Sequence, residues 1–149
     1  MNDWSSMNIS ASGLAANQLW MNVIANNIAN ANTTRTPQGG PYRSEIVNFQ
    51  AVGGTPSFQS VYGQALTSPN DGGVEDGGVE VSSITEDTSP LQSVYDPSSP
   101  DAVNGYVQEP NVDIATQMVD LVSASRAYQA NVTAFDAAKE MATTALSIK

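Results

Sequence analysis

The chain has 149 residues, with 15 acidic and 5 basic side chains and a formal net charge of −10. This length suits one modest domain, or a small domain with long extensions, and the negative charge argues against binding to nucleic acid or to an anionic membrane surface. Because cysteine and histidine are both absent, a disulfide framework, a thiolate metal site and the commonest general base are excluded. We therefore expect no catalysis and no cofactor.

The first ten residues, MNDWSSMNIS, carry no positive charge and are followed by no apolar run. A cleaved signal peptide is therefore not expected. No stretch of the chain is apolar for long enough to insert directly into a bilayer. If the protein leaves the cytoplasm, another route must recognise it.

Glycine and proline divide the chain into three segments, because they interrupt regular structure more strongly than other residues. All eight prolines lie between Pro37 and Pro110, and so do ten of the eleven glycines. Residues 1–36 and 111–149 are expected to form long helices, and residues 37–110 a small, strand-rich and loop-rich middle segment. The predicted fold is mainly α, with the two terminal helices paired as a coiled coil.

Seven-residue spacing in the N-terminal segment predicts a helix with one stripe for packing against another helix. The apolar row is Met7, Leu14, Met21 and Ile28. Its companion row is only half apolar: Ser10, Asn17, Ile24 and Ala31. Ser5 or Ser6 is a candidate N-cap, and Pro37 with the glycines after it is expected to end the helix.

Asparagines interrupt this pattern in the stretch NVIANNIANANTT, residues 22–34. Asn is a poor interior helix residue, because its side chain competes for backbone hydrogen bonds. Among packed helices, however, Asn26, Asn27 and Asn30 can bond across helices or cap the helix end, and so set the packing register. Asn32 is expected only to help end the helix.

In the middle segment, residues 41–49 and 77–84 are predicted to be strands. The repeat DGGVEDGGVE (residues 71–80) lacks the aspartate spacing of a calcium loop and is interpreted as a solvated loop. Asp96 and Asp101 invite comparison with the paired carboxylates of glycosidases. Asp-Pro and Ser-Pro are ordinary turn initiators, however, and a structural loop is the favoured interpretation.

The C-terminal segment repeats the helical pattern over a longer stretch, and Asp113 is a plausible N-cap. One heptad row is Ile114, Leu121, Tyr128, Phe135 and Ala142. The second is Met118, Ser125, Val132, Lys139 and Leu146. A further stripe, mostly alanine, is rotated by about 100° and consists of Ala127, Ala130, Ala134, Ala138, Met141, Ala145 and Ile148. A helix pair cannot cover both stripes, so self-association or assembly with related chains is expected.

These motifs resemble the bacterial flagellar axial proteins, the family of rod, hook and hook-associated proteins. SGLAANQLWMNVIANNIANANTT is similar to their N-terminal signature, and residues 111–135 to their C-terminal signature. GGPYR, VYDPSSPDA and the GYV…PNV element are typical of proximal rod members. Many relatives carry an acidic pair where this chain has Thr116 and Gln117, so no salt bridge is expected there. Residues 53–78 have no recognised counterpart.

The resemblance implies a structural subunit of the flagellar basal-body rod, the hollow shaft that crosses the periplasm and transmits torque. It implies export through the flagellar type III apparatus without a cleaved signal peptide. The implied partners are copies of the chain, other rod proteins and the junction protein between the rod and the MS ring. The residues expected at subunit interfaces are Leu14, Met21, Ile24, Asn26, Asn27, Ile28, Asn30, Leu121, Tyr128, Ala130, Val132, Ala134, Phe135 and Leu146.

Three other interpretations stay open at this point. The chain could be another axial subunit, or a helical-hairpin adaptor that forms small closed oligomers. It could also be a periplasmic carbohydrate-active enzyme that uses Asp96 and Asp101.

Overall fold

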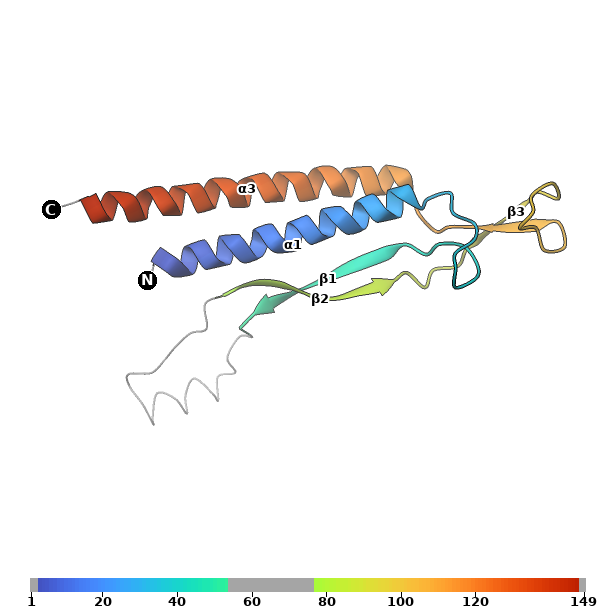
Figure 1. The fold of residues 1–149 in the computed structure, drawn as a ribbon, viewed down its shortest axis with the longest axis horizontal. Coiled ribbons are helices and arrows are strands. Elements are labelled where there is room, and N and C mark those ends of the chain that lie inside the picture. The colour runs from blue at the N-terminus through green and yellow to red at the C-terminus, as the bar shows by residue number, and fades with distance from the viewer. Residues whose placement is uncertain (1–2, 54–76, 148–149) are drawn as a thin grey trace, which may run out of the picture.

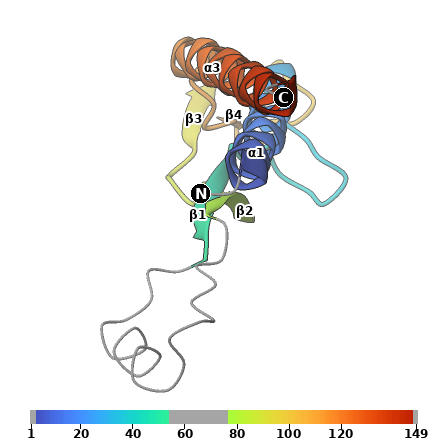
Figure 2. The same ribbon diagram turned by 90° about the vertical axis from the view of Figure 1, so that its left-hand side faces the viewer.

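The chain folds into three layers that lie side by side, each running along the long axis of the molecule (Figure 1). The computed structural model describes residues 3–53 and 77–147. One long helix lies between an antiparallel second helix and a β-hairpin (Figure 2), and another hairpin extends beyond the helix pair, at the end opposite to both chain termini. The elements are α1 (Asp3–Ala29), β1 (Glu45–Val52), β2 (Gly78–Glu86), β3 (Gln92–Tyr95), β4 (Tyr106–Glu109) and α3 (Ile114–Ser147). The predicted mainly α fold is confirmed.

The two helices pack along heptad rows, and both predicted rows on α1 and one on α3 are covered; in the companion row of α1, Ser10 and Ile24 are buried and Asn17 and Ala31 half-buried. The row from Met7 on α1 is half-buried, as are Leu121 and the later members of its row on α3. The second row predicted for α3 is wrong, because it points away from α1: Met118 is 55% exposed and Leu146 86% exposed. Small and polar side chains take its place against α1, namely Gln117, Ala124, Asn131 and Ala138.

The helix ends differ from the predictions in two respects. α1 ends at Ala29 rather than near Pro37. The Asn30 N–H still bonds to the backbone oxygen of Asn26 at 3.1 Å, but the next N–H, of Ala31, bonds to the Ile28 oxygen in a tighter turn. Ser5 and Ser6 lie inside α1 and are not its N-cap.

The N-cap predicted for α3 is confirmed. Asp113 Oδ1 accepts from the backbone N–H of Ala115 at 3.0 Å, and Oδ2 accepts from the Thr116 hydroxyl at 2.7 Å. These bonds satisfy a donor that the first helical turn leaves without a partner, and they lower the pKa of the Asp113 carboxyl.

Both predicted strands are present, and they pair as the antiparallel hairpin β1–β2, with Glu45 opposite Glu86 and a bulge at Asn48/Phe49. The hairpin is held to α1 by an edge-to-face contact between Trp20 and Phe49, whose ring centroids are 5.7 Å apart. The Ser12 hydroxyl also accepts the Val79 N–H at 3.1 Å. Most of the repeat at residues 71–80 lies outside the described residues, as does most of residues 53–78.

The two helices are in close contact at Gly13. A Cβ atom there would lie 2.7 Å from Asn131 Nδ2 and 3.1 Å from its Cγ. We predict that Gly13→Val lowers the free energy of unfolding by about 1–3 kcal/mol through overpacking, although Val is the better helix former. Denaturant titration measures this change. Adding Asn131→Ala should recover most of the loss; a stabilised Gly13→Val single variant would contradict the close contact.

Candidate assembly site

Asn27 is the best-connected side chain in the asparagine-rich motif, and it is 1% exposed. Its Nδ2 donates to the Glu45 backbone oxygen at 2.9 Å and to Gln117 Oε1 at 3.0 Å. Its Oδ1 accepts from the Tyr42 hydroxyl and from the Glu45 N–H, both at 2.9 Å. One carboxamide therefore uses two donors and two acceptor positions to join α1 to α3, to β1 and to the segment before β1.

The Asn27 carboxamide is stable in this core because its donors and acceptor are all hydrogen-bonded. A buried carboxamide without partners costs about 1–3 kcal/mol for each unpaired group. Within the described part of the chain, no buried side-chain nitrogen or oxygen lacks a hydrogen-bond partner. The motif predicted a role for Asn27 in bonding across helices, and Gln117 provides that bond; Tyr42 and Glu45 were not foreseen, because their approach depends on how the hairpin folds back.

Tyr42 borders this network, and burial, followed by the carboxylates of Glu45 and Glu86, raises its pKa to about 12. Its hydroxyl donates to Asn27 and also accepts from Asn26 Nδ2 at 3.3 Å. The phenol thus stays protonated and keeps its donor at neutral pH.

The other two asparagines act at the helix end. Asn30 donates to the backbone oxygen of Asn26 and to its side-chain Oδ1, at 2.9 and 3.0 Å. Asn26 itself is exposed and reaches Glu45 Oε2 at 3.4 Å. The motif therefore combines one buried link with an exposed helix terminus.

The structure separates the residues predicted at subunit interfaces into three groups. Ile24 and Asn27 are buried inside the chain, where their side chains contact residues of this chain. Half-buried residues are Leu14, Met21, Ile28, Asn30, Leu121, Tyr128 and Phe135. Exposed residues are Asn26, Ala130, Val132, Ala134 and Leu146.

The predicted alanine stripe is only partly exposed to solvent. Ala138 is 3% exposed and packs against α1, which corrects its assignment to an outward stripe; its neighbours in the predicted stripe, Ala130 and Ala134, are exposed. Ile148 lies outside the described residues.

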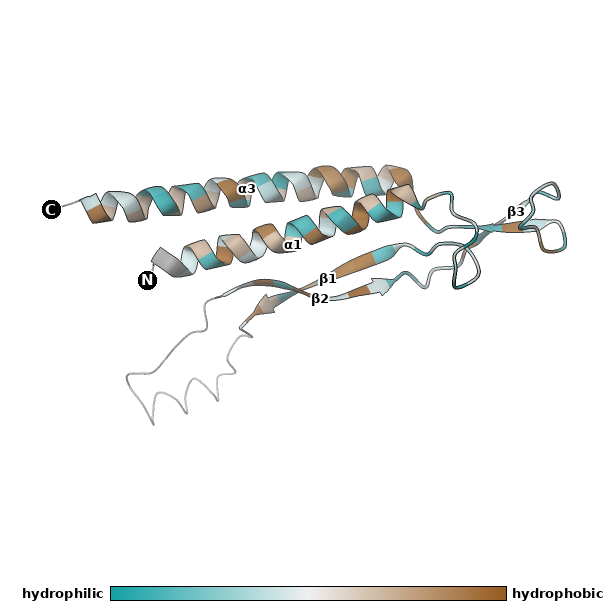
Figure 3. Cartoon of the chain, viewed as in Figure 1, coloured by the Kyte–Doolittle hydropathy of each residue, from teal (hydrophilic) through white to brown (hydrophobic). Residues whose placement is uncertain are grey.

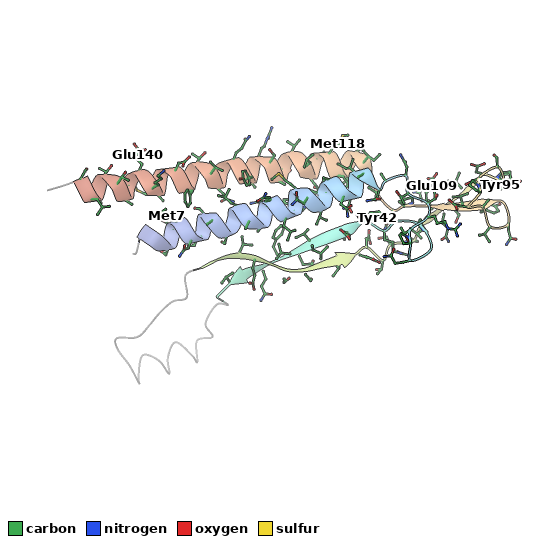
Figure 4. All side chains as sticks on the ribbon, in the orientation of Figure 1. Met7, Tyr42, Tyr95, Glu109, Met118 and Glu140 are labelled. Atoms are coloured by element: carbon green, nitrogen blue, oxygen red, sulfur yellow. The ribbon has the colours of Figure 1, made fainter. Side chains whose placement is uncertain are left out.

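An exposed apolar face near the start of α3 was not recognised as a unit from the sequence. Val119 and Val122 are 65% and 52% exposed, and Met118 beside them points away from α1 (Figure 4). Hydropathy colouring shows the same concentration at this end of α3 (Figure 3). The sequence contained the spacing that identifies this face, since positions 119, 122 and 126 share one side of a helix. Val119 and Val122, however, were assigned to no heptad row.

Asp96 and Asp101 have separate structural roles. Asp96 Oδ1 accepts from the Ser98 hydroxyl and backbone N–H, at 2.7 and 3.1 Å. Asp101 accepts from the Thr34 hydroxyl at 2.9 Å and pairs with Arg35 at 3.5 Å. The hydrogen bonds from Ser98 lower the pKa of Asp96, whereas a glycosidase acid needs a raised pKa. The geometry supports the turn interpretation.

Residues 3–53 and 77–147 contain no group of three His, Cys, Asp or Glu side chains that could hold a metal ion. No helix among the described residues is long and apolar enough to cross a membrane.

Comparison with known proteins gives the class of the chain. Residues 7–35 match the family described as "Flagella basal body rod protein". Residues 103–148 match the family described as "Flagellar basal body rod FlgEFG protein C-terminal". These ranges contain most of α1 and α3, the two helices that Asn27 and Gln117 join.

Curated relatives match over nearly the whole chain. The flagellar basal-body rod protein FlgC of Bacillus subtilis is 46% identical over 153 residues, covering 99% of both chains. FlgC of Borreliella burgdorferi is 43% identical, covering 97% of this chain and 96% of the relative. FlgC of Salmonella typhimurium is 41% identical over 89% and 87%. The chain belongs to the FlgC family of flagellar basal-body rod proteins.

We predict that Asn27→Leu lowers the free energy of unfolding by about 3 kcal/mol, because it leaves the partners on α3, β1 and Tyr42 buried without their hydrogen bonds. Urea titration measures the loss. Asn22→Leu is the matched control: Asn22 lies on the exposed side of α1, so a change within about 0.5 kcal/mol is expected. Equal losses for the two variants would contradict the central role of Asn27.

Stability should also fall at alkaline pH through Tyr42. The pKa of its hydroxyl is raised in the folded chain from 10.0 to about 12, so the folded state holds the proton more tightly than the unfolded state. The stabilisation that protonated Tyr42 contributes to the folded state is fully present below pH 10 and is lost as the pH rises toward 12. Unfolding titrations across this interval should show a decline that Tyr42→Phe reduces; an unchanged pH slope would refute the assignment.

Proposed function

We propose that this chain is a structural subunit of the proximal rod of the flagellar basal body, which polymerises into the hollow shaft that transmits torque and passes export substrates. The observation that carries the proposal is the match to FlgC proteins over nearly the full length of both chains. A second observation supports it: the paired helices leave large apolar side chains such as Val119 and Leu146 exposed, as a subunit completed by its neighbours would.

The three layers suggest how the subunit sits in a tube wall. Residues 1–36 and 111–149 together would form the inner coiled-coil domain, and residues 37–110 the outer part. This orientation is supported by the layer order, in which β1–β2 covers only one side of the helix pair and leaves α3 uncovered on the other (Figure 2).

The proposed partners follow from this role. They are copies of the chain, other proximal and distal rod proteins, and the junction protein between the rod and the MS ring. The chain would reach the rod through the flagellar type III export apparatus without a cleaved signal peptide, and would lie where the rod crosses the periplasm. No enzymatic activity is proposed, and Asp96 and Asp101 are assigned to turns.

The proposed contacts with neighbours use the exposed members of the predicted interface, together with the half-buried residues at the edges of the helix seam. Ala130 and Ala134 are central to this proposal, because exposed small side chains allow another backbone to approach closely. Asn26 and Leu146 lie exposed near opposite ends of the helix pair, so a contact along its whole length would include both.

Leu at Ala130 and Ala134 tests these contacts. If the surface is closely packed in the rod, each substitution should cost about 1–3 kcal/mol by overpacking, repeated at every copy, so rods should not be completed and motility should be lost. Unfolding of the isolated chain should change little, because both positions are exposed and Leu is a good helix former.

The readout is rod completion and motility, with export of each variant measured separately. Gln129→Glu is the control on an exposed neighbouring position and should be tolerated. Leu variants that are exported and still build complete rods would show that Ala130 and Ala134 contact no neighbour.

A further inference from the structure

A hollow of about 220 Å³ lies where β1 and the beginning of α3 both flank α1. Its size is several times the roughly 30 Å³ that one water molecule occupies in the liquid. Ile46 and Phe49, which line it, are 47% and 43% exposed, so apolar surface is open to solvent at its edge. Side chains of this kind, exposed around a concave site, are typical of a binding surface.

The hollow also carries negative charge. Glu45 and Asp120 line it, and no lysine or arginine lies within ion-pair distance of either carboxylate in the described part of the chain, where the one ion pair joins Arg35 and Asp101. An occupant with aliphatic side chains and a positive charge beside them would complement both features.

The opposite side of α3 presents such a surface. Val119, Val122 and Arg126 follow the i, i+3, i+7 spacing of one helical face, and both valines are more than half exposed. Arg126 is exposed and has no salt-bridge partner among the described residues. Arg126 and Asp120 are six residues apart and therefore about 120° apart around the helix, so one copy cannot bring this face to its own hollow.

We propose that the hollow between β1 and α3 receives the Val119–Val122–Arg126 face of a second copy of this chain, with Arg126 placed against Asp120 and Glu45. This inference rests on the proposed function and specifies a contact between neighbouring subunits. It is heterologous, because the hollow and the inserted face are different surfaces of the chain. Contacts of this kind propagate into rings or open helical assemblies. The inserted face also continues into Ala130 one turn further along α3.

The absence of cysteine from the native chain makes cross-linking a direct test. In a variant with Val122→Cys and Ile46→Cys, a short thiol cross-linker applied to isolated basal bodies, and to the purified chain at high concentration, should give a ladder of dimers, trimers and larger products. Val122→Cys with Gln50→Cys is the matched control, since Gln50 is an exposed residue of β1 that does not line the hollow, and it should give at least about tenfold less product.

Reversal of the charges provides the second arm. Arg126→Asp and Asp120→Lys should each reduce the cross-linked product by roughly tenfold or more, because like charges then face each other, and the two changes combined should restore part of it, since Glu45 stays negative. Three results would overturn the proposal. They are cross-linking between Val122→Cys single variants, equal amounts of product with the Gln50 control, and no recovery of the ladder when the two charge reversals are combined.

The proposed function and the proposed contact between copies can be refuted separately. If the chain is absent from basal bodies, the proposed function is refuted. Cross-linking of the purified chain then tests the proposed contact on its own. A chain that is present in rods but is cross-linked through Ile46 only to a different rod protein leaves the function standing and refutes a second copy as the occupant.

Discussion

The arrangement of this chain depends on the hydrogen bonds of one buried carboxamide. Asn27 bonds to Gln117 on α3, to both backbone groups of Glu45 on β1 and to Tyr42. Apolar packing alone would tolerate sliding of one helix along the other, because neighbouring aliphatic side chains can exchange partners. A buried amide allows only the register in which all its partners are present, so the three layers are placed relative to one another at this point.

The central position of α1 accounts for uncharged residues on the two faces that it packs against its neighbours, while exposed positions such as Asn22 are uncharged as well. No charged residue occurs between Asp3 and Arg35, although a helix facing water on one side normally carries charges there. α1 has α3 on one side and the hairpin on the other, and a charge near either layer would lose hydration without a partner. Its polar residues are instead Ser, Asn and Gln, which can bond to backbone groups, as Ser12 and Asn27 do.

The terminal helices, both strands of the first hairpin and the Asp113 cap could be predicted from the sequence, because heptad spacing, turn residues and capping chemistry act over a few positions. The row of small and polar residues by which α3 contacts α1 could not be predicted. It contains Gln117 and Asn131, which face α1 for reasons of hydrogen bonding and close approach to Gly13, and hydrophobic periodicity does not detect either. The end of α1 was missed because the backbone tightens into turns directly after Asn30, with the Ala31 N–H bonded to Ile28, well before the proline and glycines that were expected to end the helix. At the candidate site, the motif identified Asn27, but the partners on the hairpin depend on tertiary folding.

The bond between Asn27 and Gln117 also has a consequence for the order in which the chain can fold. Its two residues are 90 positions apart, so the chain must be almost completely available before the central helix acquires its main partner. Contacts of such separation form slowly, because a long loop must close first. A chain that emerges from its N-terminus can therefore place the hairpin on α1 early, but α1 lacks its partner helix until the last quarter of the chain arrives.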